Sequence, residues 1–289
     1  MNNFSLFSRD GLSLTGYHWP VKNSKVPYAL LIIIHGLAEH CGRYENVAEF
    51  YNRNNFPVIS MDLRGHGQSG GPHTFIPSVE LIFQDIDILI EEAKRIYPFC
   101  PAVLYGHSMG GTLVLSYTLH RYPNKDDECP YQALVATSPW IRLARPLQPP
   151  RVILSLIRTA CQIRPSLNVP LRFDPRKTTR DEDIIDSYIN DSNIRRSATL
   201  SLVRNVGGMA MKLDRTKCIF HIPVLIEHGQ ADLITNHNAS LKFSERGKNI
   251  DFKSWRNCYH GLHHEPEREE IFNFTLKWIR EIIFFENYF

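Results

Sequence analysis

The chain has 289 residues, of which 43% are hydrophobic and 22% charged, and its formal net charge is +3. This composition excludes a disordered or fibrous protein, and the small, dispersed charge gives no reason to expect nucleic-acid binding. No apolar run approaches the roughly 20 residues of a membrane-spanning helix. The N-terminus lacks the features of a signal peptide and the six cysteines form no CxxC pair, so we expect a cytoplasmic protein with free thiols.

The first 140 residues alternate between strand and helix patterns. Two runs of alternating residues meet at Asp10-Gly11 and predict an antiparallel hairpin. The continuous apolar run at residues 28–36 predicts a strand buried on both faces. By the same patterns we expect strands at 56–62, 102–107 and 133–139, and helices at 43–54, 79–98 and 108–120.

The last third of the chain continues this alternation, with strands expected at 222–229 and 250–255 and a closing helix at 267–284. Strands that alternate with helices predict an α/β fold with a mostly parallel sheet covered on both faces. The intervening residues 139–205 lose the buried strand patterns and gain proline and arginine. We therefore expect these residues to be an insertion outside the sheet, mostly helical or irregular.

The segment Gly106-His107-Ser108-Met109-Gly110 places a serine where a strand must become a helix. G-x-S-x-G at such a junction is typical of a nucleophile elbow, in which a strained turn projects the hydroxyl from the sheet. Three fixed residues match by chance roughly 0.1 times in a chain of this length, and the position between strand and helix removes most accidental matches. The pattern predicts that Ser108 is a nucleophile.

A serine nucleophile needs a histidine to accept its proton and a carboxylate to orient that histidine. In this fold the acid and then the histidine follow the serine along the chain. Asp232 and His260 each come just after an expected strand, at the edge where such a sheet gathers its active site. Order and placement predict a triad of Ser108, Asp232 and His260.

Other residues compete for these roles. His263 and His264 are alternative bases, although we expect them at the start of the closing helix. Asp251 lies at the entry end of its strand, and Glu227 and His228 lie within or at the end of theirs, so they are weaker candidates for the acid. No HExxH, HxxEH or cysteine–histidine spacing typical of zinc is present, so we expect no metal and no cofactor.

The oxyanion of the reaction needs two backbone N–H donors. One is expected from Met109, the residue after the nucleophile, at the N-terminus of a helix whose dipole favours negative charge. The other is expected from Leu37, in the turn after the strand at 28–36. This requires Gly36 to let the turn pass close to Ser108.

Six motifs are spread over nearly the whole chain, from residue 35 to 267: HGLAEHCGRYENVA, DLRGHGQSGG, YGHSMGG, TTRDEDIIDSYINDS, GQADLIT and CYHGLHHEPE. In these motifs and their order the chain resembles the α/β-hydrolase superfamily, and within it the monoglyceride lipase and lysophospholipase-like serine hydrolases. The resemblance implies the triad and the oxyanion donors named above. It also implies a core of residues 1–138 and 206–289, with residues 139–205 forming a cap over an acyl pocket.

The remaining motif residues have structural interpretations. Residues 62–67 are expected to brace a turn beside the site. Gly36 and His107 are expected at the substrate-binding surface, His107 through a hydrogen bond within the elbow. Four residues are expected to pin the oxyanion turn to its helix: Glu39, His40, Arg43 and Tyr44.

The cap contains an apolar pattern at helical spacing over residues 151–164, with arginines at both ends. Between residues 139 and 180 there are nine basic residues and one acid. Three interpretations stay open: a helix that lines an acyl channel, an interfacial helix whose arginines meet lipid phosphates, or a helix packed on the sheet domain.

We therefore expect a serine hydrolase that cleaves carboxylic esters of single-chain lipids, monoacylglycerol foremost, with peripheral membrane contact through the cap. The alternatives are a lysophospholipase or a general short-chain carboxylesterase. A ligand-binding receptor on a hydrolase scaffold is the alternative without catalysis, and the intact Ser, Asp and His set argues against it. The expected partner is a small lipid ester and not a nucleic acid; the sequence leaves the oligomeric state open.

Overall fold

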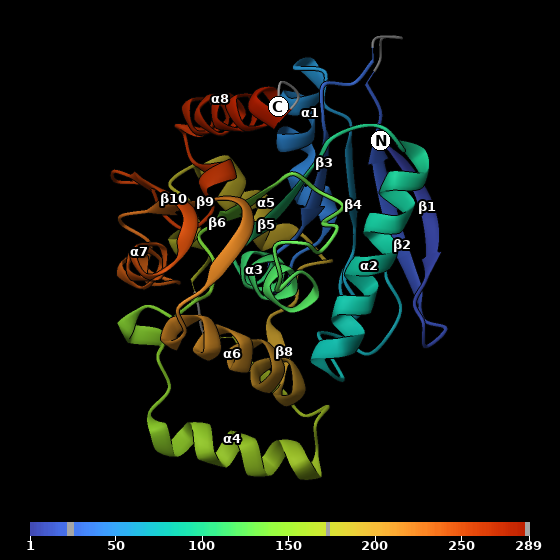
Figure 1. Cartoon of the computed structure of the whole chain (residues 1–289). Helices are drawn as coiled ribbons and strands as arrows, with labels where there is room; N and C mark the ends of the chain where they lie inside the picture. The colour runs from blue at the N-terminus through green and yellow to red at the C-terminus, as the bar shows by residue number, and fades with distance from the viewer. Residues whose placement is uncertain (22–25, 172–173, 287–289) are drawn as a thin grey trace.

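The computed structural model of the protein describes residues 1–21, 26–171 and 174–286; Arg172, one of the nine basic residues counted above, lies outside these ranges (Figure 1). Within them, eight strands form one sheet in which only β1–β2 and β2–β4 pair antiparallel. The expected, mostly parallel sheet is therefore confirmed. In spatial order the strands are β1 (Asn2–Phe7), β2 (Ser13–Trp19), β4 (Val58–Met61), β3 (Leu30–Ile34), β5 (Ala102–His107), β6 (Ala133–Thr137), β9 (Ile219–Gly229) and β10 (Lys248–Trp255).

Helices cover both faces of the sheet, which explains the continuous apolar strands. Successive residues of a strand point to opposite faces, and in β3 both sets are buried. Leu30, Ile32 and Ile34 join the core on the side of α2, α3, α6 and α7, whereas Leu31 and Ile33 join the core under α1 and α8. The helices are α1 (Glu45–Arg53), α2 (Val79–Ile96), α3 (Met109–Arg121), α6 (Leu200–Arg215), α7 (His237–Arg246) and α8 (Arg268–Glu286).

The inserted residues lie outside this sheet, as expected. They form α4 (Arg151–Ile163), α5 (Glu182–Asn190) and a separate antiparallel pair of short strands, β7 (Asn168–Pro170) and β8 (Ser197–Thr199). Helix α6 then runs unbroken from residue 200 to 215, across the expected boundary between residues 205 and 206. It does so because its buried residues, such as Leu202, Val206 and Met209, continue one apolar face onto the core.

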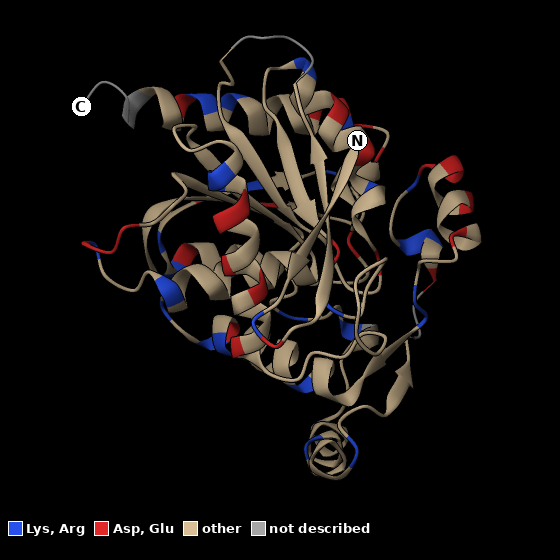
Figure 2. Cartoon of the chain, turned by 90° about the vertical axis from the view of Figure 1, so that its right-hand side faces the viewer, with Lys and Arg blue, Asp and Glu red and all other residues tan. Residues whose placement is uncertain are grey.

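Helix α4 packs against α6, and Figure 1 shows it on the far side of α6 from the sheet. Cys161 is buried on this contact side, while Val152, Leu156 and Ile163 are 70%, 59% and 77% exposed. Figure 2 shows basic and no acidic residues on α4, which is seen end-on at the bottom. Among the described residues, no helix has both the length and the apolar character needed to cross a membrane.

Candidate active site

Four of the predicted site residues follow strands that run parallel in the sheet. Leu37 follows β3, Ser108 follows β5, Asp232 follows β9 and His260 follows β10. Because the carboxyl ends of parallel strands meet at one edge of a sheet, these four segments of the chain converge there. Residues more than 200 positions apart in the sequence thereby reach the same site.

The turn that carries Ser108 is sharp and strained. Ser108 has φ 54° and ψ −114°, a conformation that side-chain-bearing residues rarely adopt, and α3 begins at the next residue. A Cβ atom on Gly106 would lie 2.4 Å from the carbonyl oxygen of Gly110, and one on Gly110 would lie 2.0 Å from the carbonyl oxygen of Ile34. Neither position has room for a side chain, which is the physical reason for the two glycines around the serine.

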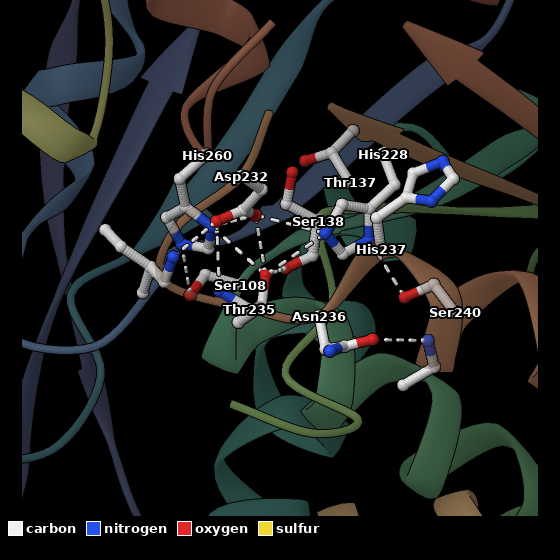
Figure 3. Close-up of polar contacts among 12 residues, drawn as sticks. Ser108, Thr137, Ser138, His228, Asp232, Thr235, Asn236, His237, Ser240 and His260 are labelled. Atoms are coloured by element: carbon white, nitrogen blue, oxygen red, sulfur yellow. Dashed lines mark hydrogen bonds and ion pairs between the residues drawn. The ribbon is translucent and has the colours of Figure 1, made fainter. Parts of the chain in front are cut away.

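Ser108, His260 and Asp232 form one chain of hydrogen bonds (Figure 3). The Nε2 atom of His260 lies 2.9 Å from Ser108 Oγ, and its Nδ1 atom lies 2.7 Å from Asp232 Oδ2. With the proton on Nδ1, the ring donates to the carboxylate and accepts from the hydroxyl. The structure therefore brings together the three residues that the sequence predicted as a triad.

The Asp232 carboxylate has further donors that the sequence analysis missed. Its Oδ1 accepts hydrogen bonds from the backbone N–H groups of Ile234 (2.7 Å) and Thr235 (2.9 Å). Its Oδ2 accepts from Thr235 Oγ1 (2.7 Å) and lies 3.0 Å from His228 Nε2. Burial alone would raise the pKa of Asp232, but the charges and hydrogen bonds of His260 and His228 hold it far below its usual value.

The other two candidate acids, Glu227 and Asp251, accept hydrogen bonds away from His260. Glu227 is buried and accepts hydrogen bonds from Trp255 Nε1 (3.0 Å) and Thr275 Oγ1 (2.7 Å), and its burial raises its pKa to about 7. Asp251 is exposed and accepts from Trp278 Nε1 at 2.7 Å. Their hydrogen bonds fix tryptophan side chains.

The expectation that His263 and His264 lie at the start of the closing helix is wrong. Both are buried in the short 3₁₀ turn Leu262–His264, before α8 begins, and both face the same cavity as Ser108. His263 stacks on Tyr44 at 4.7 Å between ring centroids, and His264 Nε2 lies 3.0 Å from the carbonyl oxygen of Arg43. Burial lowers the pKa of both, that of His264 to about 4, so both rings are neutral at neutral pH.

The turn after β3 passes close to the serine, as the oxyanion prediction requires. A Cβ atom on Gly36 would lie 3.3 Å from Ser108 Cβ and 2.6 Å from Glu39 Oε1. The same Oε1 accepts from the Gly36 N–H (2.6 Å) and the Tyr44 hydroxyl (2.7 Å), so Glu39 and Tyr44 do pin the turn. His40 Nδ1 accepts from the Gly42 N–H at 3.2 Å and so caps the 3₁₀ turn that leads into α1, as expected. Its Nε2 also lies 2.7 Å from an Asp191 carboxylate oxygen at the end of α5, a contact that was not expected.

A cavity of about 550 Å³ lies over Ser108, within the range of roughly 300–1,000 Å³ that is usual for small-molecule sites. Its floor includes Gly36 and His107, the two residues expected at the substrate-binding surface. Contrary to the prediction, the hydrogen bond of His107 is not within the elbow but joins its Nδ1 to Thr137 Oγ1 at the end of β6, 3.1 Å away. Burial, followed by the charge of His260, lowers the His107 pKa to about 3. The inserted residues supply most of the apolar wall, including Leu147, Ile153, Val169 and Leu171.

One group of possible metal ligands occurs among the described residues. Cys258, Glu265 and Glu267 have ligand atoms within 4.8 Å of one another. The Arg180 guanidinium bonds to both carboxylates and supplies the positive charge there. A metal ion at this place would have to displace that arginine.

In this site a serine hydroxyl is bonded to a histidine, and a buried carboxylate holds that histidine. The serine lies at the start of a helix and at the edge of a parallel sheet. This is the arrangement of serine hydrolases with the α/β-hydrolase fold. The family comparison gives the same class. Residues 25–267 match the Hydrolase_4 family, described as serine aminopeptidase, S33. The chain belongs to this family, and its predicted fold and enzyme class, a carboxylic ester hydrolase of the α/β-hydrolase superfamily, are confirmed.

The chain spans a different share of the length of each relative. The chain is 32% identical over 98% of its length to an uncharacterized abhydrolase domain-containing protein of Dictyostelium discoideum, but spans only 29% of that protein. It is 26% identical to a monoacylglycerol lipase of Mycolicibacterium smegmatis, covering 88% of each chain. The crystal structure of a monoacylglycerol lipase from Paleococcus ferrophilus has a TM-score of 0.76 and 27% identity, with 93% of this chain and 99% of that one covered.

Proposed function

We propose that this protein hydrolyses monoacylglycerol to a fatty acid and glycerol. One observation carries the proposal: the Ser108 hydroxyl, bonded to His260, lies in a cavity with mostly apolar walls that suits a single acyl chain. The two monoacylglycerol lipases among the relatives described above support the same substrate class.

The proposed mechanism uses the hydrogen-bonded chain in two steps. Ser108 Oγ attacks the ester carbonyl as His260 Nε2 takes its proton, and Asp232 stabilises the resulting imidazolium. The backbone N–H groups of Met109 and Leu37 bind the oxyanion. His260 then gives the proton to the departing glycerol oxygen, which leaves Ser108 acylated. Water, deprotonated by His260, attacks the acyl-enzyme and releases the fatty acid.

The inserted residues act in this proposal as a cap. The inserted residues supply most of the apolar wall over Ser108, where the acyl chain would lie. The division into a core of residues 1–138 and 206–289 and a cap follows the change in architecture at β6, with α6 joining the two parts.

The first experiment compares the release of fatty acid from a monoacylglycerol, the matching lysophospholipid and p-nitrophenyl butyrate. We expect the fastest turnover with monoacylglycerol and a loss of kcat of at least about 10⁴-fold in Ser108→Ala. Faster turnover of the lysophospholipid or of the butyrate ester would favour the corresponding alternative. A folded wild type that acts on none of them and does not react with a fluorophosphonate probe would favour a ligand receptor.

We also propose that the cap touches the membrane surface through α4. The helix carries exposed apolar residues and only basic charges, a combination typical of interfacial helices. Val152→Ser/Leu156→Ser should weaken co-sedimentation with anionic vesicles without changing the hydrolysis of p-nitrophenyl butyrate. Phe99→Ser is the matched control, because Phe99 is 97% exposed on another part of the molecule. Equal vesicle binding by the double variant and the wild type would contradict this proposal.

A further inference from the structure

The loop that carries His260 is bonded to three consecutive cap residues. The loop runs from the end of β10 at Trp255 to the start of α8 at Arg268. The Gly261 N–H, directly after His260, donates to the carbonyl oxygen of Thr178 at 2.6 Å. Thr179 Oγ1 donates to the carbonyl oxygen of His264 at 2.7 Å. The cap backbone thus lies against the residues that follow the histidine.

Arg180 makes the strongest of these links. Its Nε donates to Glu265 Oε2 at 2.6 Å, its backbone N–H donates to Glu265 Oε1 at 3.0 Å, and its guanidinium also bonds to Glu267. Charge-assisted hydrogen bonds from arginine to both oxygens of one carboxylate fix position as well as supply energy. Arg180 therefore fixes both the place and the orientation of the Glu265 carboxylate.

Glu265 has no exposed side-chain surface, so its charge depends on this partner. Within the described part of the chain, Arg180 is the only cation that forms an ion pair with it. A buried carboxylate that loses its counter-ion is strongly destabilised and moves toward water or takes up a proton. Such a movement would displace the loop and His260 with it, because Glu265 lies only five residues beyond His260.

The core holds the loop at other points. The Ala231 N–H donates to the carbonyl oxygen of Cys258 at 3.0 Å, and Asn46 Nδ2 donates to that of His263 at 2.5 Å. His260 lies between these points and is itself held at 2.9 Å from the serine hydroxyl. The cap contacts are therefore one part of the set that holds the loop, alongside the core contacts and the bond of His260 to Asp232.

We propose that Arg180 is a positioning residue for His260, so that this part of the cap supports the reaction as well as covering the substrate. The proposal rests on the proposed role of His260 as the base. It predicts that loss of Arg180 lowers kcat, since misplacing a catalytic group by about 1 Å can cost 10²-fold in rate. Substrate binding would change little, because the Arg180 side chain itself does not line the cavity over Ser108.

The test measures kcat and KM for monoacylglycerol, the rate of fluorophosphonate labelling of Ser108, and the melting temperature. Arg180→Gln is expected to lower kcat and the labelling rate at least tenfold with KM within about threefold of wild type. Arg180→Lys keeps the positive charge and should recover much of the rate. Arg142→Gln is the matched control, because it breaks another arginine–carboxylate pair of the insertion, with Asp214, and should leave kcat unchanged.

A second variant separates positioning from stability. Arg180→Met/Glu265→Leu removes the link together with the buried charge, so the melting temperature should recover while kcat stays low. Recovery of kcat along with stability would overturn the proposal, as would an increase in KM at constant kcat. The labelling rate needs no lipid substrate, so it still reports on His260 if monoacylglycerol is not the substrate. A Ser108 that never labels in the wild type would instead contradict the proposed function.

Discussion

At Asp232, five donors converge on one buried carboxylate: two backbone N–H groups, one hydroxyl and two imidazoles. The backbone donors and Thr235 orient the carboxylate, and the imidazoles keep it ionised in spite of burial. Because this anion is rigidly placed, His260 keeps its Nδ1 proton toward it and leaves Nε2 free to accept from Ser108. The hydrogen bond of the Ser108 hydroxyl thus depends on the surroundings of Asp232, a residue that Ser108 does not touch.

Asp232→Asn tests this dependence. The amide nitrogen would donate to His260 Nδ1 and force the ring into the tautomer whose Nε2 cannot accept a proton. We expect kcat to fall about 10³–10⁴-fold while the protein stays folded. The measurement is kcat at neutral pH together with circular dichroism, and a loss of less than tenfold would show that the anion is dispensable.

Among the helices, α3 and α6 show that the surroundings of a glycine determine whether it stabilises or destabilises its helix. In α3, Gly110 lies where the helix meets the end of β3, and a Cβ atom there would contact backbone that cannot move independently. In α6, Gly208 has nothing within 4 Å of an added Cβ atom. The first glycine is required by packing, whereas the second weakens its helix.

Alanine substitutions at these positions should have opposite effects. Gly110→Ala is expected to lower the melting temperature and the activity, because Ser108 and α3 must shift to avoid the clash. Gly208→Ala should raise stability by up to about 1 kcal/mol, the difference in helix propensity. Chemical denaturation of both variants is the measurement, and a shift of the same sign in both would contradict this explanation.

The sequence patterns predicted most accurately the strands and helices in which apolar residues form a clear pattern. The strands β3 to β6 and helices α1 to α3 all lie within a few residues of their predicted ranges. Strands buried on both sheet faces are continuously apolar, and α1 and α2 each bury one apolar face. Helix α3 is buried on nearly all sides, and its place between two strands predicted it. Helix α7 was not predicted. Its ten residues, HNASLKFSER, place only a short apolar face against the core, and its start depends on the Asn236 side chain accepting from the Ala239 N–H.

For the whole molecule, burial beside the site has consequences for stability as a function of pH. Glu227 is a buried residue of β9 that bonds to Trp255 of β10 and Thr275 of α8, and burial raises its pKa to about 7. A carboxyl with a raised pKa stabilises the fold fully below its unfolded pKa of about 4.3, and that contribution is lost as the pH rises through 7. The buried histidines His66, His107 and His264, whose pKa values are lowered to about 3, 3 and 4, act in the opposite direction.

Glu227→Gln isolates the carboxyl from the histidines, because their contributions are common to both proteins. In the variant the amide oxygen can accept from Trp255 Nε1 and the amide nitrogen can donate to Thr275 Oγ1, whose hydroxyl proton then goes to the carbonyl oxygen of Ile271, 2.9 Å away. Relative to the variant, the wild type should lose about 3 kcal/mol of unfolding free energy between pH 4.5 and 7.5. Urea denaturation across this range measures the difference, and a constant difference would show that Glu227 stays in one protonation state.

The amino-acid sequence alone predicted the alternating strands and helices of the core apart from α7, the mostly parallel sheet, and Ser108, Asp232 and His260 as candidate site residues. It could do so because periodicity, glycine placement and position after a strand are local properties, and the parallel sheet converts them into convergence at one edge.

Only the tertiary structure showed which side chains contact and hold these three residues. No local pattern marks the roles of His228 beside Asp232, of the buried pair His263 and His264, or of Arg180, the cap residue bonded to the loop of His260. Their contacts join separate segments, and the distances between those segments depend on how loops and the insertion pack in three dimensions. A hydrogen bond needs its atoms placed within a few tenths of an ångström, and that placement is a property of the packed molecule.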